Sequence, residues 1–336
     1  MSTSRHHGQA PRSSLLHLML EPVTRGDPSD EAFVARCLLG AGWVGASRRL
    51  SMLDLRVWAA LCGMFHGQHL RATGEHDPDL DSRVARMVHT TGYQLADRVW
   101  ADDGGAPYRR LLQSLGRLAS ARVLMQTVEP DLDLAALRVH AANLTLIGDI
   151  GMESTRLNPG SPREWGALKG STSLRVEIGY WPAQQIVAQR CTWLDLDLLR
   201  ALGPGLSARL FAALEAWARW PQRSMDGAEE TAIGLGRPAL ESLGVGGYER
   251  GKDARAALNR AGAKIVAVDP AYQLVRCEKR GGWCLVIRRV SGARARAAAR
   301  RDAPWRSPGI VATRRQRAER AAVRAQAHAS LADGSS

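Results

Sequence analysis

The chain has 336 residues, which is long enough for two domains with a hydrophobic core each. Hydrophobic residues make up 45% of it, so most of the chain is expected to fold. The formal net charge is +13, and a strongly basic chain favours a polyanionic partner. No apolar run approaches the roughly 20 residues of a transmembrane helix, and no clear signal peptide is present.

The cysteines and histidines indicate neither a disulfide framework nor a metal site. The five cysteines are Cys37, Cys62, Cys191, Cys277 and Cys284. An odd, scattered set without a CxxC pair is typical of reduced thiols, so we expect a cytoplasmic protein. The nine histidines form neither an H-x-H nor an HExxH pattern. We therefore predict no metal and no cofactor.

The N-terminal part leads from an arm into a strong helix. Residues 1–46 are predicted to be an arm, flexible over 1–14, with a candidate short helix over 30–42. A helix is predicted to begin after Ser51, which is placed to form a capping box with Asp54. The apolar face of this helix follows at spacings of three and four residues: Leu55, Trp58, Cys62 and Phe65.

One pattern of helix, glycine-rich break, basic helix and apolar run occurs twice. The first copy spans residues 93–100, 102–105, 108–118 and 123–128. The second copy spans residues 238–243, 244–247, 248–260 and 264–268. With the apolar runs read as strands, this order is typical of a winged helix-turn-helix, whose second helix enters the major groove of DNA. We predict an α+β fold with two tandem winged-helix domains, a flexible N-terminal arm and an arginine-rich C-terminal tail.

The predicted domain boundaries follow from these patterns. The segments are an N-terminal arm at 1–46, winged-helix domains at 47–196 and 197–292, and a basic, disordered tail at 293–336. Residues 288–324 carry twelve arginines against Asp302 and Glu319, a net charge of +10. Arginine suits bidentate contacts to phosphate, so we favour non-specific nucleic-acid contact. The alternative is a solvated extension whose arginine content reflects a GC-rich genome.

The basic helix of the first copy is predicted to have an apolar face and a donor-rich face. Leu111, Leu115 and Leu118 share the apolar face. A major-groove helix requires such a division, with donors directed outward. The alternative is an ordinary surface helix with solvated arginines. The predicted DNA-contacting residues are Arg109, Arg110, Gln113, Ser114 and Arg117.

The second copy ends in a hairpin whose tip carries two cations. Strands are predicted at 272–277 and 283–288, with the turn at 279–282 between them. A basic wing tip would lie against phosphate or in the minor groove, and the alternative is a plain exposed hairpin. The predicted DNA-contacting residues of this copy are Arg250, Lys252, Arg255, Asn259, Lys279 and Arg280.

Residues 246–252 (GGYERGK) fit the first seven positions of a P-loop. The eighth position requires Ser or Thr to hold Mg²⁺, and here it is Asp253, which would repel phosphate. The preceding residues are predicted to be a helix rather than the required buried strand. We therefore predict a non-enzymatic protein, with no catalytic residue. An RNA-binding alternative would favour aromatic stacking platforms, and the chain has only three Phe and five Tyr.

Three stretches resemble plasmid replication initiators with two winged-helix domains, the RepA and TrfA-like proteins. They are residues 50–58 (LSMLDLRVW), 108–118 (YRRLLQSLGRL) and 206–214 (LSARLFAAL). The resemblance covers about residues 47–290. The chain departs from the family pattern in its long 129–172 segment and in its arginine-rich tail.

The resemblance implies a function without catalytic residues. Such initiators bind direct repeats at an origin as monomers, help to open an adjacent AT-rich stretch, and recruit the host initiator and the replicative helicase. Many also dimerise through the first winged helix. The predicted function is sequence-specific binding of double-stranded DNA that initiates replication at a plasmid-type origin. The alternative is a winged-helix transcriptional regulator; neither involves a membrane.

Overall fold

The computed structural model describes part of the chain. The described residues are 7–11, 33–36, 42–46, 50–72, 80–100, 106–127, 144–153, 170–187, 191–216, 222–223, 228–290 and 295. These residues form an α+β fold in which every strand pairing is antiparallel. Most of the predicted arm, of the 129–172 segment and of the tail lies outside the described residues.

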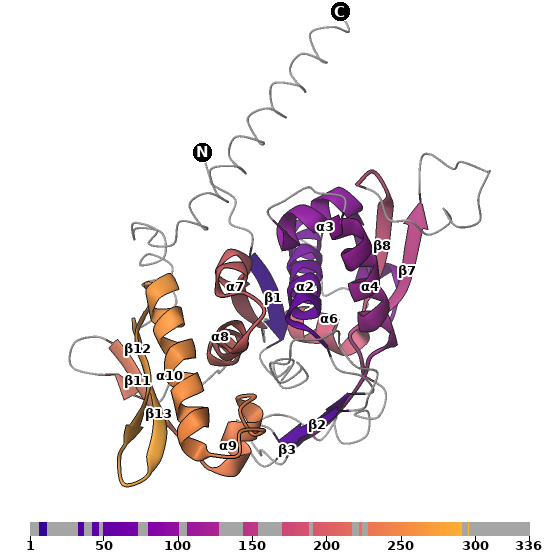
Figure 1. Cartoon of the computed structure of the whole chain (residues 1–336). Helices are drawn as coiled ribbons and strands as arrows, with labels where there is room; N and C mark the ends of the chain where they lie inside the picture. Colours follow the sequence, from indigo (N-terminus) through magenta and orange to yellow (C-terminus); the bar gives the residue numbers. More distant parts are fainter. Residues whose placement is uncertain are drawn as a thin grey trace, which may run out of the picture.

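The N-terminal residues contribute three strands. β1 (His7–Pro11) pairs with β9 (Cys191–Asp195), and Figure 1 shows it between α2 and α7. β2 (Phe33–Arg36) pairs with β3 (Gly42–Ala46). The prediction of a short helix over 30–42 is therefore wrong, and His7–Pro11 is paired strand rather than free arm. Local propensity missed β1 because its partner lies 180 to 188 residues away, and it missed the β2-β3 pair, whose sheet continues to the distant β5.

The first unit contains a long helix, a short helix pair and a three-stranded sheet. Its helices are α2 (Met52–Ala72), η1 (Val84–Arg86), α3 (Gly92–Val99) and α4 (Ala106–Ser120). Its strands are β4 (Met87–Thr91), β7 (Ile147–Glu153) and β8 (Ser173–Ile178). The order in the sheet is β4-β8-β7, so the last strand lies between the other two.

The start of α2 follows the sequence prediction. Ser51 N donates to Asp54 Oδ2 at 2.7 Å, and Asp54 N donates to Ser51 Oγ, which forms the predicted capping box. α3 has a second capping box, between Thr91 and Gln94. The predicted apolar face of α2 is buried, with Trp58 fully inaccessible.

The apolar run after α4 forms a strand, but in a different sheet from the one predicted. β5 (Arg122–Thr127) pairs with β3 and with β6 (Leu144–Thr145), giving a sheet of order β2-β3-β5-β6. The hairpin that follows α4 in the first unit is instead made by β7 and β8. β5 does follow the basic helix in the chain, as predicted, but it is not a strand of the wing of this unit.

Three short elements connect the units. They are α6 (Tyr180–Val187), β9 and α7 (Leu196–Leu202). Asp195 caps α7, since its Oδ1 accepts from the backbone N–H groups of Asp197 and Leu198.

The second unit repeats the element order of the first. Its helices are α8 (Leu206–Ala216), α9 (Arg237–Ser242) and α10 (Gly251–Val268). Its strands are β10 (Gln222–Arg223), β11 (Ala228–Gly234), β12 (Tyr272–Lys279) and β13 (Trp283–Val290), in the order β10-β11-β13-β12. In both units a helix, a strand, two helices and a hairpin follow in this order, and the last strand pairs with the strand before the two helices, β8 with β4 and β13 with β11.

Two details of the second unit differ from prediction. Residues 264–268 form the last turns of α10 and not a strand. Arg288 and Arg289, counted above with the basic tail, belong to β13 and pair with Glu230 and Glu229.

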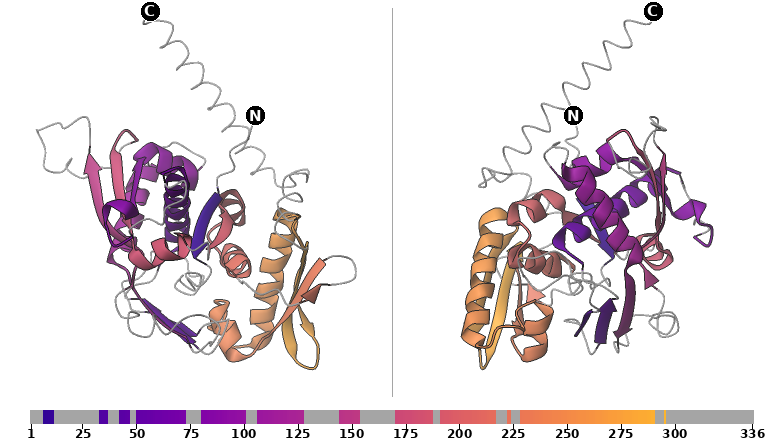
Figure 2. Two further views of the ribbon diagram at one scale, coloured as in Figure 1. Left: turned by 180° about the vertical axis from the view of Figure 1, so that it is seen from behind. Right: turned by 45° about the vertical axis from the view of Figure 1, so that its right-hand side comes forward.

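The two units lie side by side in Figures 1 and 2, with α7, α8 and β1 between α2 and α10. Their buried side chains form one continuous hydrophobic cluster, which includes Trp58 of α2, Leu198 of α7 and Phe211 of α8. The predicted boundary between residues 196 and 197 remains a prediction. Among the described residues, no helix combines the length and the apolar character needed to cross a membrane.

Candidate nucleic-acid interface

Helix α4 of the first unit exposes a polar stripe. Arg109, Arg110 and Gln113 lie on its exposed side, followed by Gly116 and Ser120. A methyl group added at Gly116 would meet no atom within 4 Å, so this face is open. Leu111, Leu115 and Leu118 are completely buried, as predicted. The stripe has the donors and the flat surface that a groove-binding helix needs.

Ser114 and Arg117 do not belong to that stripe. Ser114 is completely buried, and its Oγ donates to Asp54 Oδ1 at 2.5 Å. The Arg117 Nη2 lies 2.9 Å from the same oxygen, and its Nε donates to both carboxylate oxygens. Asp54 is itself fully inaccessible. The predicted outward orientation of these two residues is therefore wrong, since both fix α4 to the first turn of α2.

The start of α10 gathers cations in the second unit. Arg250 and Lys252 are exposed on either side of Gly251, where the helix begins. The N-terminus of an 18-residue helix carries a partial positive charge from its unpaired N–H groups. Arg250, Lys252 and the helix N-terminus share a positive charge that suits a phosphate group, and Asp253 in the first turn opposes it.

Arg255 lies one turn further along α10 and stacks on an aromatic ring. Its guanidinium carbon is 4.1 Å from the centroid of the Trp283 ring, at the start of β13. Trp283 is 44% exposed, which makes it one of the few large apolar side chains at the described surface. Sequence reasoning placed Trp283 in a strand and gave it no role.

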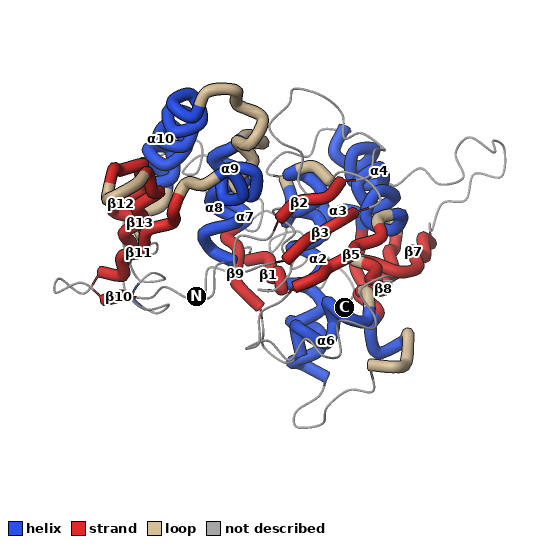
Figure 3. Tube along the Cα trace, turned by 90° about the horizontal axis from the view of Figure 1, so that it is seen from below, coloured by secondary structure: helices blue, strands red, loops and turns tan. Residues whose placement is uncertain are grey.

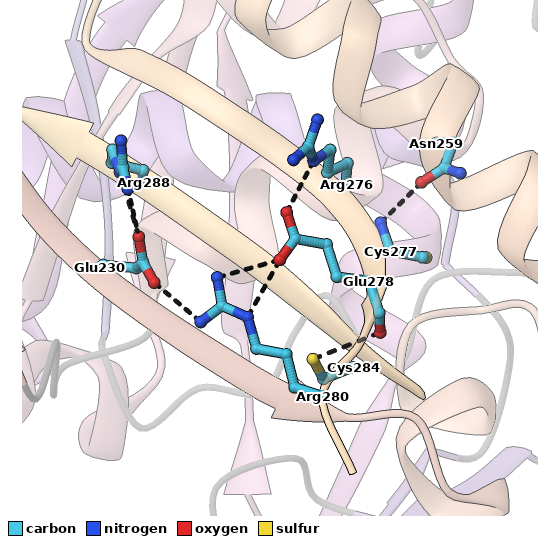
Figure 4. Close-up of polar contacts among 8 residues, drawn as sticks. All are labelled: Glu230, Asn259, Arg276, Cys277, Glu278, Arg280, Cys284 and Arg288. Atoms are coloured by element: carbon cyan, nitrogen blue, oxygen red, sulfur yellow. Dashed lines mark hydrogen bonds and ion pairs between the residues drawn. The ribbon is translucent and has the colours of Figure 1, made fainter. Parts of the chain in front are cut away.

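Asn259 is exposed but already engaged with the sheet. Its Oδ1 accepts from the backbone N–H of Cys277 at 2.7 Å and so ties α10 to β12 (Figure 4). The Cys277 thiol lies beside the Arg255 carbonyl, and burial raises its pKa to about 11. α10 also packs closely on β12 at Gly262, where an added methyl group would lie 2.0 Å from the Val275 carbonyl oxygen.

The outer face of the second sheet carries a network of ion pairs, shown in Figure 4. Arg280 Nη1 lies 2.9 Å from Glu230 and Nη2 lies 2.9 Å from Glu278. Arg276 and Arg288 pair with the same two carboxylates, at 2.7 and 2.8 Å. The hydrogen bonds from Arg280 and Arg288 lower the pKa of Glu230. Of the two predicted wing-tip cations, Arg280 is thus partly neutralised, whereas Lys279 is exposed.

A buried arginine supports the turn before α10. Arg209 of α8 is 2% exposed, and burial lowers its pKa to about 10. Gly244 has a φ of +80°, and a methyl group there would lie 2.8 Å from the Arg209 guanidinium. Glycine serves both needs at this position, since the left-handed backbone and the close approach exclude a side chain.

The two exposed helices lie on the same side of the molecule. In Figure 3, seen from below, α10 and α4 both lie in the upper part of the view, above the strands of their own units. The structure therefore brings together Arg109, Arg110 and Gln113 of α4, and separately Arg250, Lys252, Arg255 and Lys279 around the start of α10.

The P-loop-like segment, residues 246–252, lies between two helices. α9 precedes it where a nucleotide-binding loop requires a strand. In the part of the chain that the structure describes, no three His, Cys, Asp or Glu side chains are grouped to hold a metal ion.

Comparisons with known proteins found similar solved structures and no relative by sequence. No family model and no curated protein matches the chain. A crystal structure of selenomethionine derivatives of domains 2 and 3 of RctB superposes with a TM-score of 0.48 at 10% sequence identity, covering 84% of this chain and 99% of that one. A second crystal structure of RctB domains 2-3 gives a TM-score of 0.41 at 10% identity, covering 83% and 97%.

Proposed function

We propose that this chain is a DNA-binding protein that holds one duplex with two winged helices. The observation that carries the proposal is the repeated element order: in each unit an exposed basic helix precedes the hairpin, and the last strand lies between its hairpin partner and the strand before the helix pair, as β8 lies between β7 and β4 and β13 between β12 and β11. In a winged helix that helix lies in the major groove. Because α4 and α10 lie on the same side of the molecule, we expect one duplex to contact both (Figure 3).

The two units present different side chains, which favours an asymmetric binding site. α4 offers Arg109, Arg110 and Gln113, whereas α10 offers Arg250, Lys252 and Arg255. A symmetric repressor would read the same half-site twice through identical units. Two unlike units in one chain read adjacent half-sites, and their linkage raises the effective concentration of the second contact.

An asymmetric binding site is suited to DNA that carries direct repeats. This feature and the resemblance of residues 47–290 to plasmid replication initiators support a role in initiation at a plasmid-type origin. The free energy of binding to tandem repeats would drive the bending and opening of the duplex, which requires no catalytic residue, metal or cofactor. The partners proposed are double-stranded origin DNA, the host initiator and the replicative helicase, with a homodimer through the first unit, in the cytoplasm.

The basic tail is proposed to add affinity without specificity. Its arginines neutralise phosphates of any sequence and release counterions, so deleting residues 293–336 should flatten the salt dependence of binding and leave site preference intact. A truncated protein with an unchanged salt slope would remove the tail from the interface.

The test has two stages. Selection of binding sites from random duplex DNA should yield one long asymmetric site, with protection over two adjacent half-sites. A plasmid that carries this gene and its flanking DNA as the sole origin should then be maintained. Maintenance should be lost in an Arg110→Glu and Lys252→Glu double variant, in which two exposed cations are reversed. A gene that alters transcription of a neighbour but never supports maintenance would establish the regulator alternative.

A further inference from the structure

One face of the second hairpin is directed toward α10. Lys279 and Trp283 are register partners at the end of the hairpin, so their side chains lie on the same face. The Arg255 guanidinium lies 4.1 Å from the centroid of the Trp283 ring, which shows that this face meets α10. A cation so close to an indole ring is attracted by the negative charge of the ring face.

The position of the Arg255 side chain is restricted from a second direction. Gly251 lies one turn earlier on α10, and a methyl group there would be 3.1 Å from Arg255 Nη1. The guanidinium thus rests close to the helix backbone as well as on the ring. Side chains held in this way lose less rotamer entropy when they bind a ligand.

The N–H groups of this guanidinium remain available. Among the residues that the structure describes, none accepts a hydrogen bond from the Arg255 side chain, and none forms an ion pair with it. The arginines of the opposite sheet face differ, because Arg280 and Arg288 both bond to Glu230. Stacking occupies the flat face of a guanidinium and leaves its in-plane donors free for a planar acceptor.

We propose that Arg255, held by Trp283, reads a guanine in the major groove, and that Trp283 is a positioning residue; this inference rests on the proposed function. Guanine presents N7 and O6 as a pair of acceptors that matches the arginine fork. Asn259 is a poorer reader, because a bidentate contact to adenine requires its Oδ1 and that atom already accepts from Cys277 N.

The experiment measures binding of the selected duplex and of duplexes with each base pair changed in turn. In Arg255→Ala the preference for guanine should fall at one position by about 5- to 150-fold. Arg255→Lys should lose the same preference, because lysine keeps the charge but not the fork. Trp283→Ala should weaken the preference at that same position by about two- to fivefold, and Trp283→Phe should retain it.

Tyr248 supplies the control, since it is 45% exposed and its loss removes a similar aromatic surface. Tyr248→Ala should leave the guanine preference unchanged. Trp283→Ala should add nothing in an Arg255→Ala background, as expected when one residue acts through the other. Additive losses would overturn the positioning role and make Trp283 a DNA contact.

The inference and the proposed function fail differently. A wild-type protein without any base preference would refute the proposed sequence-specific function. A wild-type protein with a clear site, whose Arg255→Ala variant keeps every base preference, would refute only the assignment of Arg255. Thermal unfolding of each variant distinguishes a lost contact from a lost fold.

Discussion

The exposed helices of the two units are attached to their cores by different means. α4 is fixed by polar contacts, in which Ser114 and Arg117 both bond to the buried Asp54 of α2. α10 is fixed by close backbone packing, with Gly262 against Val275 of β12, and its side-chain hydrogen bonds go to backbone groups, from Lys264 to the Leu202 carbonyl and to Asn259 from the Cys277 N–H. The sequence therefore does not distinguish an arginine that anchors a helix, such as Arg117, from an exposed one, such as Arg110.

This difference sets how much of each polar face remains available. The first unit uses Arg117 internally and keeps Arg109 and Arg110 exposed. In the second unit the ion pairs of Glu230 and Glu278 lie on the outer face of the sheet. Arg250 and Lys252 at the start of α10 remain exposed. We therefore expect some substitutions to lower the free energy of unfolding and others to weaken DNA binding, and we expect these residues to lie on different elements in the two units.

The largest expected effect is the loss of the Asp54 carboxylate. Asp54→Ala leaves Arg117 and Ser114 without their acceptor and removes the carboxylate half of the capping box, the bond from Ser51 N, which should lower the free energy of unfolding by about 3 kcal/mol. The measurement is urea denaturation. Glu278→Ala, which removes a carboxylate from the more exposed network, should leave the denaturation midpoint almost unchanged. Equal losses would contradict the distinction between the two networks.

A pair of glycines tests the packing of the two helices. Gly262→Ala places a methyl group 2.0 Å from the Val275 carbonyl oxygen, so α10 must shift, at a cost of about 1–3 kcal/mol. Gly116→Ala on α4 meets no atom within 4 Å and should stabilise the helix by about 0.5–1 kcal/mol. Thermal unfolding should therefore move in opposite directions. A stabilised Gly262→Ala protein would refute the close approach of α10 to β12.

Two arginines of α4 have different expected roles: Arg110 binds DNA, and Arg117 holds α4 against α2. Arg110→Ala should leave the free energy of unfolding unchanged within about 0.5 kcal/mol and should reduce the salt slope of DNA binding by about 0.9 if it loses one phosphate contact. Arg117→Ala should destabilise the protein, because it leaves the buried Asp54 carboxylate without its cation. Fluorescence anisotropy over a salt series gives the slope. The assignment is reversed if Arg117→Ala alters the salt slope without altering stability.

The smallest effect is expected at Glu230. Its pKa is lowered by hydrogen bonds from Arg280 and Arg288, so these contacts stabilise the fold at pH above the unfolded pKa of about 4.3. That stability, at most about 1 kcal/mol for such exposed pairs, is lost as the pH falls through the lower folded pKa. Glu230→Gln should flatten this acid limb in pH-dependent unfolding. It should also steepen the salt slope of DNA binding, because two arginines gain free charge.

The sequence by itself determined the local elements. The capping box of Ser51 and Asp54, the buried face of α2, the glycine break before α10 and the hairpin of β12 and β13 all follow from short-range patterns. These features depend on residues a few positions apart, whose spacing fixes which face they share and which backbone groups they satisfy. The two consecutive helices of each unit follow for the same reason, whereas the strand predicted over 264–268 is part of α10 and β5 belongs to another sheet.

Tertiary packing decides which polar residues are exposed, which are engaged inside the fold, and which strands form each sheet. Asp54 and Arg117 are 63 positions apart, and Glu230 and Arg280 are 50 apart, so no local period reveals that they pair. The partner of β5 and the contact of Arg255 with Trp283 likewise depend on how distant segments pack. Amphipathic spacing assigns a residue to a helix face, but whether that face meets a buried carboxylate or solvent depends on the element that packs against it.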